Sequence, residues 1–414
     1  MFKNPRLALI YTITFIDAVV AGGLGPLFNK YSEGLSAKQV WVMGGSALLL
    51  GTQLILSPIL GSLSDKIGRR PVLIGTAVGS LLASFFLFPI KIWGYLGNRA
   101  VEGTTNGMSA VLRSAVVDTA GDKDVMQQTS IQGTITALGA IFGPAVGGLL
   151  IIALPQARFD PTPLVIMGVV LAVINIVLTC VFKETNDKEK QPVDVGELKK
   201  KMVNALKVTT LWKQLDDVDE KLKGFKSLYI LQLLTLLGLS YYNYFIAYLI
   251  VGDLALTPRE ASYFFIFYGL MCITTNLIFF QFLVKHVNQK KMLVWLAIAG
   301  IGVMALYAFT GGSVTLLYVA GATDSLTVGL LAGLISGLTA QLAAKGEGQG
   351  SVFGDTQALG GVAAFGAAIV TTGLTALDAR APFAFYALAL AVLAYRAATL
   401  PEDAEKETQP ENQK

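Results

Sequence analysis

The chain has 414 residues, of which 53% are hydrophobic and only 14% are charged, with a formal net charge of +4. This composition leaves too little polar surface for a soluble globule of that size and indicates a polytopic membrane protein. The basic residues gather in loops on one side of the predicted helices, so the small positive charge indicates membrane topology and not nucleic-acid binding.

Residues that carry the usual chemistry of enzymes are scarce. Cys180 and Cys272 both lie inside apolar runs, and the single histidine, His286, cannot form a multi-histidine metal site. The sequence shows no nucleophile and base set, no metal-ligand cluster and no phosphate-binding loop. We therefore expect neither an enzyme nor a protein with a metal or organic cofactor.

Apolar stretches long enough to cross the roughly 30 Å hydrocarbon core of a bilayer recur along the whole chain. Their number predicts an all-α membrane protein with both termini on the same side. The basic loops, including Lys66, Arg69 and Arg70, place that side in the cytoplasm by the positive-inside rule. The twelve predicted spans are residues 7–28, 39–60, 72–92, 93–118, 129–153, 163–182, 227–251, 260–284, 290–310, 313–341, 350–376 and 382–399.

One long polar segment divides the spans six and six. We expect a first six-helix bundle at 1–182, a cytoplasmic linker at 183–226 and a second six-helix bundle at 227–400. Apolar residues at helical spacing in the linker favour an amphipathic helix at the inner membrane surface, and a solvated linker is the alternative. The charged tail at 401–414 predicts disorder.

The stretch from Gly61 to Ile74 reads GSLSDKIGRRPVLI and lies between the second and third spans. Its glycines, Gly61 and Gly68, permit a tight turn and close backbone approach, and Pro71 suits the first turn of the next helix. An ordinary basic loop would explain the arginines but not this spacing of glycine and aspartate. The order GxLxDKxGRRxxxI resembles the loop between helices 2 and 3 of the major facilitator superfamily.

The fifth predicted span contains the order GxxxGPxxGG. Glycines four apart on a membrane helix make a groove for a neighbouring helix, and proline loosens the backbone hydrogen-bond ladder. Small-residue packing explains the glycines alone, while the complete order is similar to the motif of antiporter families in the same superfamily. The residues concerned are Gly139, Gly143, Pro144, Gly147 and Gly148.

Ionisable side chains inside a bilayer are costly and usually functional. Asp17, Arg99, Glu102, Asp324 and Asp355 are the candidates for proton coupling or for the substrate cavity. Arg99 and Glu102 are three residues apart and can pair across one turn. A shift of 221 residues between the two halves places Asp324 beside the position of Glu102, so we expect both acids at similar depth, facing a shared cavity.

Each acid also has a structural alternative. Asp17 could hydrogen-bond to a neighbouring helix, and Glu102 could serve only to neutralise Arg99. Asp355 could be exposed to water or have a purely structural role. Arg113 is placed to pair with Asp65 or Asp118, as a gate latch at the cytoplasmic ends of two spans.

The latch includes the 61–74 stretch. We expect Asp65 to stabilise the N-terminal end of the eleventh span by its charge and to hold the cytoplasmic side closed. The predicted gate residues are Gly61, Asp65, Gly68, Arg69, Arg70, Arg113 and Asp118.

The seventh span is rich in aromatic residues, among them Tyr241, Tyr242 and Phe245. Aromatic faces in a cavity suit a flat or cationic apolar substrate. Contact with lipid or packing between helices is the alternative for most of them.

Further motifs of the first half, including Asp17 with Gly25 and Pro26, resemble the tetracycline-exporter and multidrug branch of proton-coupled antiporters. The resemblance implies a proton-coupled exporter, with protons as the coupling ion, of an apolar or cationic small molecule by alternating access. Tetracycline exporters carry an acid in span nine and a histidine in span eight, which this chain lacks, so tetracycline itself is in doubt. We expect a monomer in a bacterial cytoplasmic membrane. A metabolite uptake or facilitative transporter, or a non-transporting scaffold, is the alternative.

Overall fold

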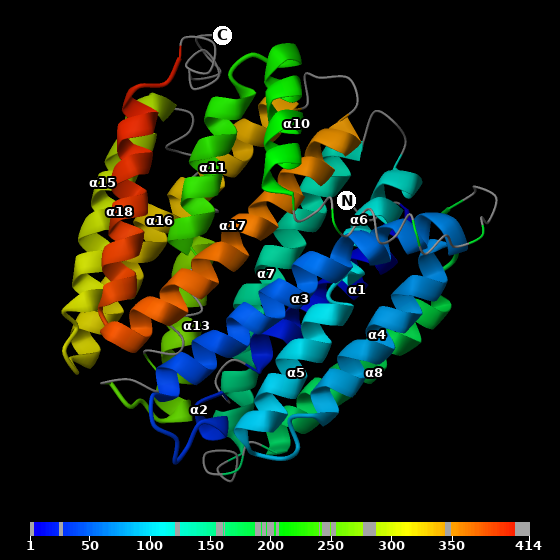
Figure 1. Cartoon of the computed structure of the whole chain (residues 1–414). Coiled ribbons are helices and arrows are strands. Elements are labelled where there is room, and N and C mark those ends of the chain that lie inside the picture. Colours follow the sequence, from blue (N-terminus) through cyan, green and yellow to red (C-terminus); the bar gives the residue numbers. More distant parts are fainter. Residues whose placement is uncertain are drawn as a thin grey trace. The chain divides into compact units, whose positions relative to one another are not determined.

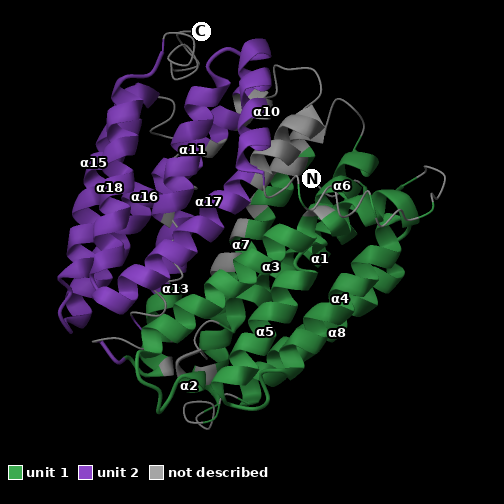
Figure 2. Cartoon of the chain, viewed as in Figure 1, with its two compact units in different colours: residues 1–206, 256–266 green, residues 207–255, 267–414 purple. Residues whose placement is uncertain are grey.

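The structure is a computed structural model. It describes residues 4–24, 28–120, 125–154, 160, 162–186, 192, 196, 203, 207–239, 241, 249, 254–275, 287–343 and 349–401. Within these ranges the regular secondary structure is helical, and no strand occurs. The chain divides into two compact units (Figures 1 and 2).

Unit 1 comprises residues 1–206 and 256–266. Its core is formed by apolar side chains of three helices, with Ile10, Leu73 and Val111 fully buried, and by Phe182. Its helices are α1 (Pro5–Gly23), α2 (Phe28–Tyr31), α3 (Lys38–Ile67), α4 (Arg69–Phe85), α5 (Ile92–Thr105), α6 (Met108–Thr119), α7 (Val125–Ala153) and α8 (Thr162–Val181).

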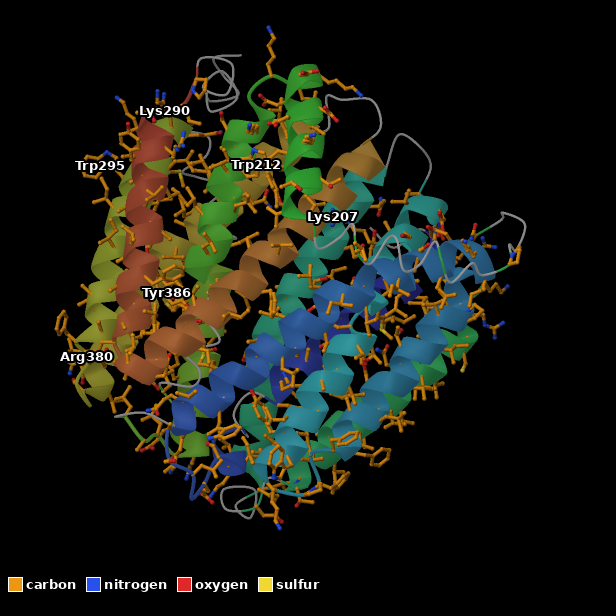
Figure 3. All side chains as sticks on the ribbon, in the orientation of Figure 1. Lys207, Trp212, Lys290, Trp295, Arg380 and Tyr386 are labelled. Carbon is orange, nitrogen blue, oxygen red and sulfur yellow. The ribbon has the colours of Figure 1, made fainter. Side chains whose placement is uncertain are left out.

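Unit 2 comprises residues 207–255 and 267–414, and its boundary with unit 1 falls inside α13 (Pro258–Thr274). Helix α15 packs against α16 and α18, and α11 packs against the same two helices. Lys290 and Arg380 lie at opposite ends of this unit, and Tyr386 lies between them along α18 (Figure 3). The other helices are α10 (Val208–Lys221), α11 (Phe225–Leu239), α15 (Gln289–Ala308), α16 (Val314–Ala343), α17 (Gln349–Leu377) and α18 (Ala381–Ala398).

Local sequence explains where several helices begin. Pro5 occupies the first turn of α1, and the side chain of Asn4 accepts a hydrogen bond from the Arg6 backbone N–H. Asn288 caps α15 in the same way, accepting from the N–H of Lys291 at 3.2 Å. These caps satisfy backbone donors that a helix start leaves without partners.

Every predicted span contains a helix, and seven helices of the described residues are long and apolar enough to cross a membrane. Large apolar side chains point outward on several of them, including Val181, Leu377 and Leu388. Exposed apolar surface of this extent is stable against lipid and not against water. The fold is thus that of a helical integral membrane protein, while twelve spans and cytoplasmic termini stay predictions.

The fourth predicted span, 93–118, is wrong as a single helix. It is divided into α5 and α6, with Asn106 and Gly107 between them. A Cβ atom on Gly107 would lie 2.4 Å from Leu60 Cδ1, so this position fits against α3 only without a side chain. The break is therefore associated with close packing on a neighbouring helix.

The polar segment between the halves contains α10. Leu211 and Leu215 on this helix are buried, and α10 packs against α11 and α17. Lys226 forms an ion pair with Asp216 and also lies over the ring of Trp212, which is labelled in Figure 3. The structure therefore has an amphipathic helix here, which is part of unit 2 and packs on α11 and α17 through its apolar side.

Candidate functional site

The turn between α3 and α4 depends on one glycine. Gly68 adopts φ +107°, and a Cβ atom at this position would lie 2.4 Å from Glu184 Oε2. Side chains rarely tolerate such a backbone, and here the carboxylate also fills the space. Gly61 lies inside α3, and a Cβ atom added there would have no described atom within 4 Å. The turn therefore depends on Gly68 and does not include Gly61, whose expected role in close backbone approach stays a prediction.

Arg69, the first residue of α4, bridges the ends of three helices. Only 6% of this residue is exposed. Its Nε donates to Asp118 Oδ2 at 2.9 Å, and its guanidinium donates to Asp65 Oδ1 at 2.5 Å. The partner of both acids in the structure is thus Arg69, whereas the sequence pointed to Arg113. The pairing proposed for Arg113 stays a prediction.

Glu184, three residues beyond α8, completes this network. Its carboxylate accepts hydrogen bonds from the backbone N–H groups of Arg69, Arg70, Thr185 and Asn186, at 2.8 to 3.1 Å. Burial raises the pKa of the Glu184 carboxyl, but these donors outweigh burial and hold the pKa below its ordinary value. We call Asp65, Arg69, Asp118, Glu184 and Asn186 the α3–α4 clamp.

Two further bonds join the end of α8 and the residues after it to the α3–α4 turn. Asn186 Nδ2 donates to the backbone oxygen of Asp65 at 2.8 Å, and Arg70 donates to the backbone oxygen of Cys180 at 2.6 Å. The beginning of the segment that leads to unit 2 is therefore tied to the α3–α4 turn.

The Glu184→Gln variant should lose about 1 kcal/mol of stability at pH 7, since an amide oxygen accepts N–H bonds less strongly than a carboxylate. A carboxyl whose pKa is depressed by folding stabilises the protein above its unfolded pKa and loses that contribution as pH falls through the folded value. The difference from wild type in thermal unfolding should therefore be constant from pH 8 to about 5 and shrink as pH falls below the ordinary glutamate pKa of about 4.3, until it is lost below the depressed folded pKa. Glu33→Gln, at an exposed ion pair with Lys30, is the matched control. A constant difference at all pH values would contradict this role.

The glycines of α7 lie against α1. A Cβ atom on Gly143 would lie 2.8 Å from the backbone nitrogen of Gly23 and 2.8 Å from the backbone oxygen of Val19. Gly139 and Gly147 would clash with α1 in the same way. Pro144 lies inside the helix and is buried, as is Gly148. The predicted packing motif thus forms the contact between α1 and α7.

Unit 1 carries an acidic cluster of half-buried residues on α1 and α5, namely Asp17, Arg99 and Glu102. The charge of Glu102 acts on Asp17, and the charge of Arg99 acts on Glu102. The guanidinium of Arg99 donates to Asn98 Oδ1 through Nε at 2.9 Å and Nη2 at 2.6 Å. It also lies over the ring of Tyr95, 5.7 Å from the centroid. The cluster therefore holds two acids and one cation from two helices.

Asn98, the hydrogen-bond partner of Arg99, is a residue that sequence reasoning missed. It is 1% exposed, and its Nδ2 donates to the backbone oxygen of Ala83 at 2.9 Å. This bond fixes the amide so that its oxygen faces Arg99. A polar residue directly before an intramembrane arginine was the available signal.

A second buried acid lies in unit 2. Asp324 on α16 is 1% exposed. Its Oδ2 accepts hydrogen bonds from the hydroxyls of Tyr241 at 2.5 Å, Tyr307 at 3.0 Å and Tyr268 at 3.1 Å. We call Asp324 with these three residues the tyrosine cage. Of the aromatics predicted to line a cavity, Tyr241 is thus in contact with an acid.

Several predicted site residues fall outside the described parts of the chain. They are Tyr242, Phe245 and the side chain of Asp355. The expected contact of Asp65 with the start of the eleventh span also involves residues that are not described.

The comparison with protein families decides the classification. The Major Facilitator Superfamily sequence model matches residues 7–217 and 228–414. This chain belongs to the Major Facilitator Superfamily. It is therefore a member of a family of integral membrane proteins.

Curated relatives of this facilitator chain include tetracycline resistance proteins. The class H protein of Pasteurella multocida is 34% identical over 153 residues, which is 36% of this chain and 38% of the relative. The class B protein of Escherichia coli is 29% identical over 205 residues, 47% of this chain and 48% of the relative. The matches thus span less than half the length of these relatives.

Solved structures agree on the fold. The human organic anion transporter MFSD10 (TETRAN) has a TM-score of 0.68 at 16% identity, covering 95% of this chain and 100% of that one. A peptide transporter POT in complex with sulfate has a TM-score of 0.68 at 14% identity, covering 98% and 96%. At such low identity these likenesses show the facilitator fold alone.

Proposed function

We propose that this chain is a proton-coupled antiporter that exports an apolar or cationic small molecule by alternating access. The tetracycline resistance relatives, which are about 30% identical over part of the chain, support drug export. Their bacterial sources support a place in a bacterial cytoplasmic membrane. The substrate class rests on the chemistry of the buried acids and not on those names.

The observation that carries the proposal is the acidic cluster of Asp17, Arg99 and Glu102. Two acids within electrostatic reach of each other cannot both be ionised cheaply inside a bilayer, and one arginine offsets only one of them. The second acid therefore needs a proton or a cationic substrate. This requirement couples the binding of a proton to the release of the substrate, and the binding of the substrate to the release of a proton.

The cycle follows from that competition. On the outer side an acid of the cluster takes a proton from water and the substrate leaves. On the inner side the same acid returns the proton to water and the carboxylate accepts the substrate. Each half-cycle exchanges one charge-neutralising ligand for the other, so neither the proton nor the substrate crosses alone.

Glu102→Gln should reduce pH-gradient-driven transport of ethidium and of magnesium–tetracycline at least about tenfold in everted membrane vesicles, because an amide cannot exchange a proton. Membrane content of the protein should stay at the wild-type level. Glu33→Gln, outside the cluster and exposed, is the control and should transport normally. Full transport by both Glu102→Gln and Asp17→Asn would remove the proposal.

A further inference from the structure

The tyrosine cage uses only one of the two oxygens of Asp324. All three tyrosine hydroxyls donate to Oδ2, from residues that are 83, 56 and 17 positions away in the chain. Oδ1 is buried and has no hydrogen-bond partner among the described residues. Such an oxygen is rare, because buried polar atoms are nearly always bonded.

The described surroundings of Asp324 contain no cation. The titratable groups that act on it are Tyr241, Tyr268 and Tyr307, and Cys272 lies within electrostatic reach. Glu102 differs, because the charge of Arg99 acts on it from one turn away. An ionised carboxylate sealed from water without a counter-charge is unstable, and binding a proton removes the charge.

The burial of Oδ1 also limits what it binds in this conformation. No water molecule from the surface can contact Oδ1, because the atom is buried and only 1% of the residue is exposed. A proton needs no cavity, whereas an organic cation does. The three donors on Oδ2 leave Oδ1 as the oxygen that remains open to protonation.

We propose that Asp324 carries a further exchanged proton of this antiporter on Oδ1, beside the one exchanged at the acidic cluster of unit 1, and that Tyr241, Tyr268 and Tyr307 are positioning residues that hold Oδ2. The inference rests on the proposed function, and it names an acid in unit 2 that takes part in proton exchange. When the cage opens to one side, the carboxylate takes a proton from hydronium and leaves water. When it opens to the other side, the carboxyl returns the proton to water and becomes a carboxylate again.

The test separates proton coupling from substrate movement. The purified full chain in liposomes is measured for ethidium accumulation driven by a pH gradient, and for ethidium counterflow, which requires no net proton movement. Asp324→Asn should lose gradient-driven accumulation at least about tenfold while it keeps at least about a third of counterflow. Asp324→Glu, which retains a carboxyl, should recover part of the accumulation.

The tyrosines give a second readout that does not remove the acid. Tyr268→Phe deletes one donor to Oδ2 and should reduce gradient-driven transport at least about threefold, which is a larger loss than the same variant shows in counterflow. Tyr263→Phe is the matched control on the same helix, because Tyr263 is 40% exposed and lies outside the cage.

Three outcomes would overturn the inference in distinguishable ways. Accumulation by Asp324→Asn at the wild-type rate would show that Asp324 carries no exchanged proton, and would leave the acidic cluster of unit 1 as the proton carrier. Loss of both activities in folded Asp324→Asn, with Tyr268→Phe unchanged, would make Asp324 a substrate ligand instead. Failure of wild type to accumulate ethidium or magnesium–tetracycline under a pH gradient would overturn the proposed function, and this inference with it.

Discussion

The Gly143→Ala variant should destabilise the protein by about 2 kcal/mol or more, because an added methyl group overpacks the contact between α1 and α7. The atoms that its Cβ would meet at 2.8 to 3.0 Å belong to the backbone of α1, at Val19, Gly22 and Gly23. Backbone atoms of a packed helix cannot swing aside as a side chain does. The midpoint of thermal unfolding in detergent, with the yield of folded protein, measures the loss.

Gly133→Ala is the matched control on the same helix. No described atom lies within 4 Å of its Cβ position, and the residue is exposed. Alanine is the better helix former, so this variant should be neutral or slightly more stable. Equal stability of Gly143→Ala and Gly133→Ala would contradict close packing of α7 on α1.

The Gly68→Ala variant should reduce transport strongly, because it disrupts the α3–α4 clamp. Alanine would have to adopt φ +107° and would also displace the Glu184 carboxylate from its backbone donors. Non-glycine residues held in rare backbone conformations cost of order 1–3 kcal/mol. Gradient-driven ethidium transport per folded molecule, together with thermal unfolding, measures both effects.

Gly61→Ala tests whether the turn or the motif as a whole matters. Gly61 lies in the regular helix α3 with open space at its Cβ position among the described residues. This variant should fold and be as stable as wild type. A loss as large as that of Gly68→Ala would mean that Gly61 meets a part of the molecule in another state of the cycle.

Hydropathy predicted the helices well because a bilayer forces long apolar runs into helices with satisfied backbones. The break at Gly107 was not predictable, since it accompanies close packing on Leu60, and such packing leaves no local signal. The 61–74 stretch was recognised by its residue order. Which of its residues pair was not, because Asp118 and Glu184 approach Arg69 from 49 and 115 positions away.

For the acids too, the residues themselves could be predicted from the sequence and their partners could not. Intramembrane charge singled out Asp17, Glu102 and Asp324, since an ionisable group in an apolar run stands out in any sequence. The partners did not stand out. Tyr241 was singled out as a cavity aromatic, but its pairing with Asp324 was not, since only tertiary packing brings the two together across 83 positions. Asn98 and Tyr307 are ordinary residues in their own helices.

The measurement that tests proton-coupled antiport most directly follows both ions in the same vesicles. Liposomes that contain the purified chain and a trapped pH-sensitive dye receive ethidium outside, with no pH gradient imposed. Antiport predicts that ethidium entry expels protons, so that the internal pH rises in wild type and stays constant with Glu102→Gln. Ethidium entry by wild type with no change in internal pH, or with acidification, would contradict the account.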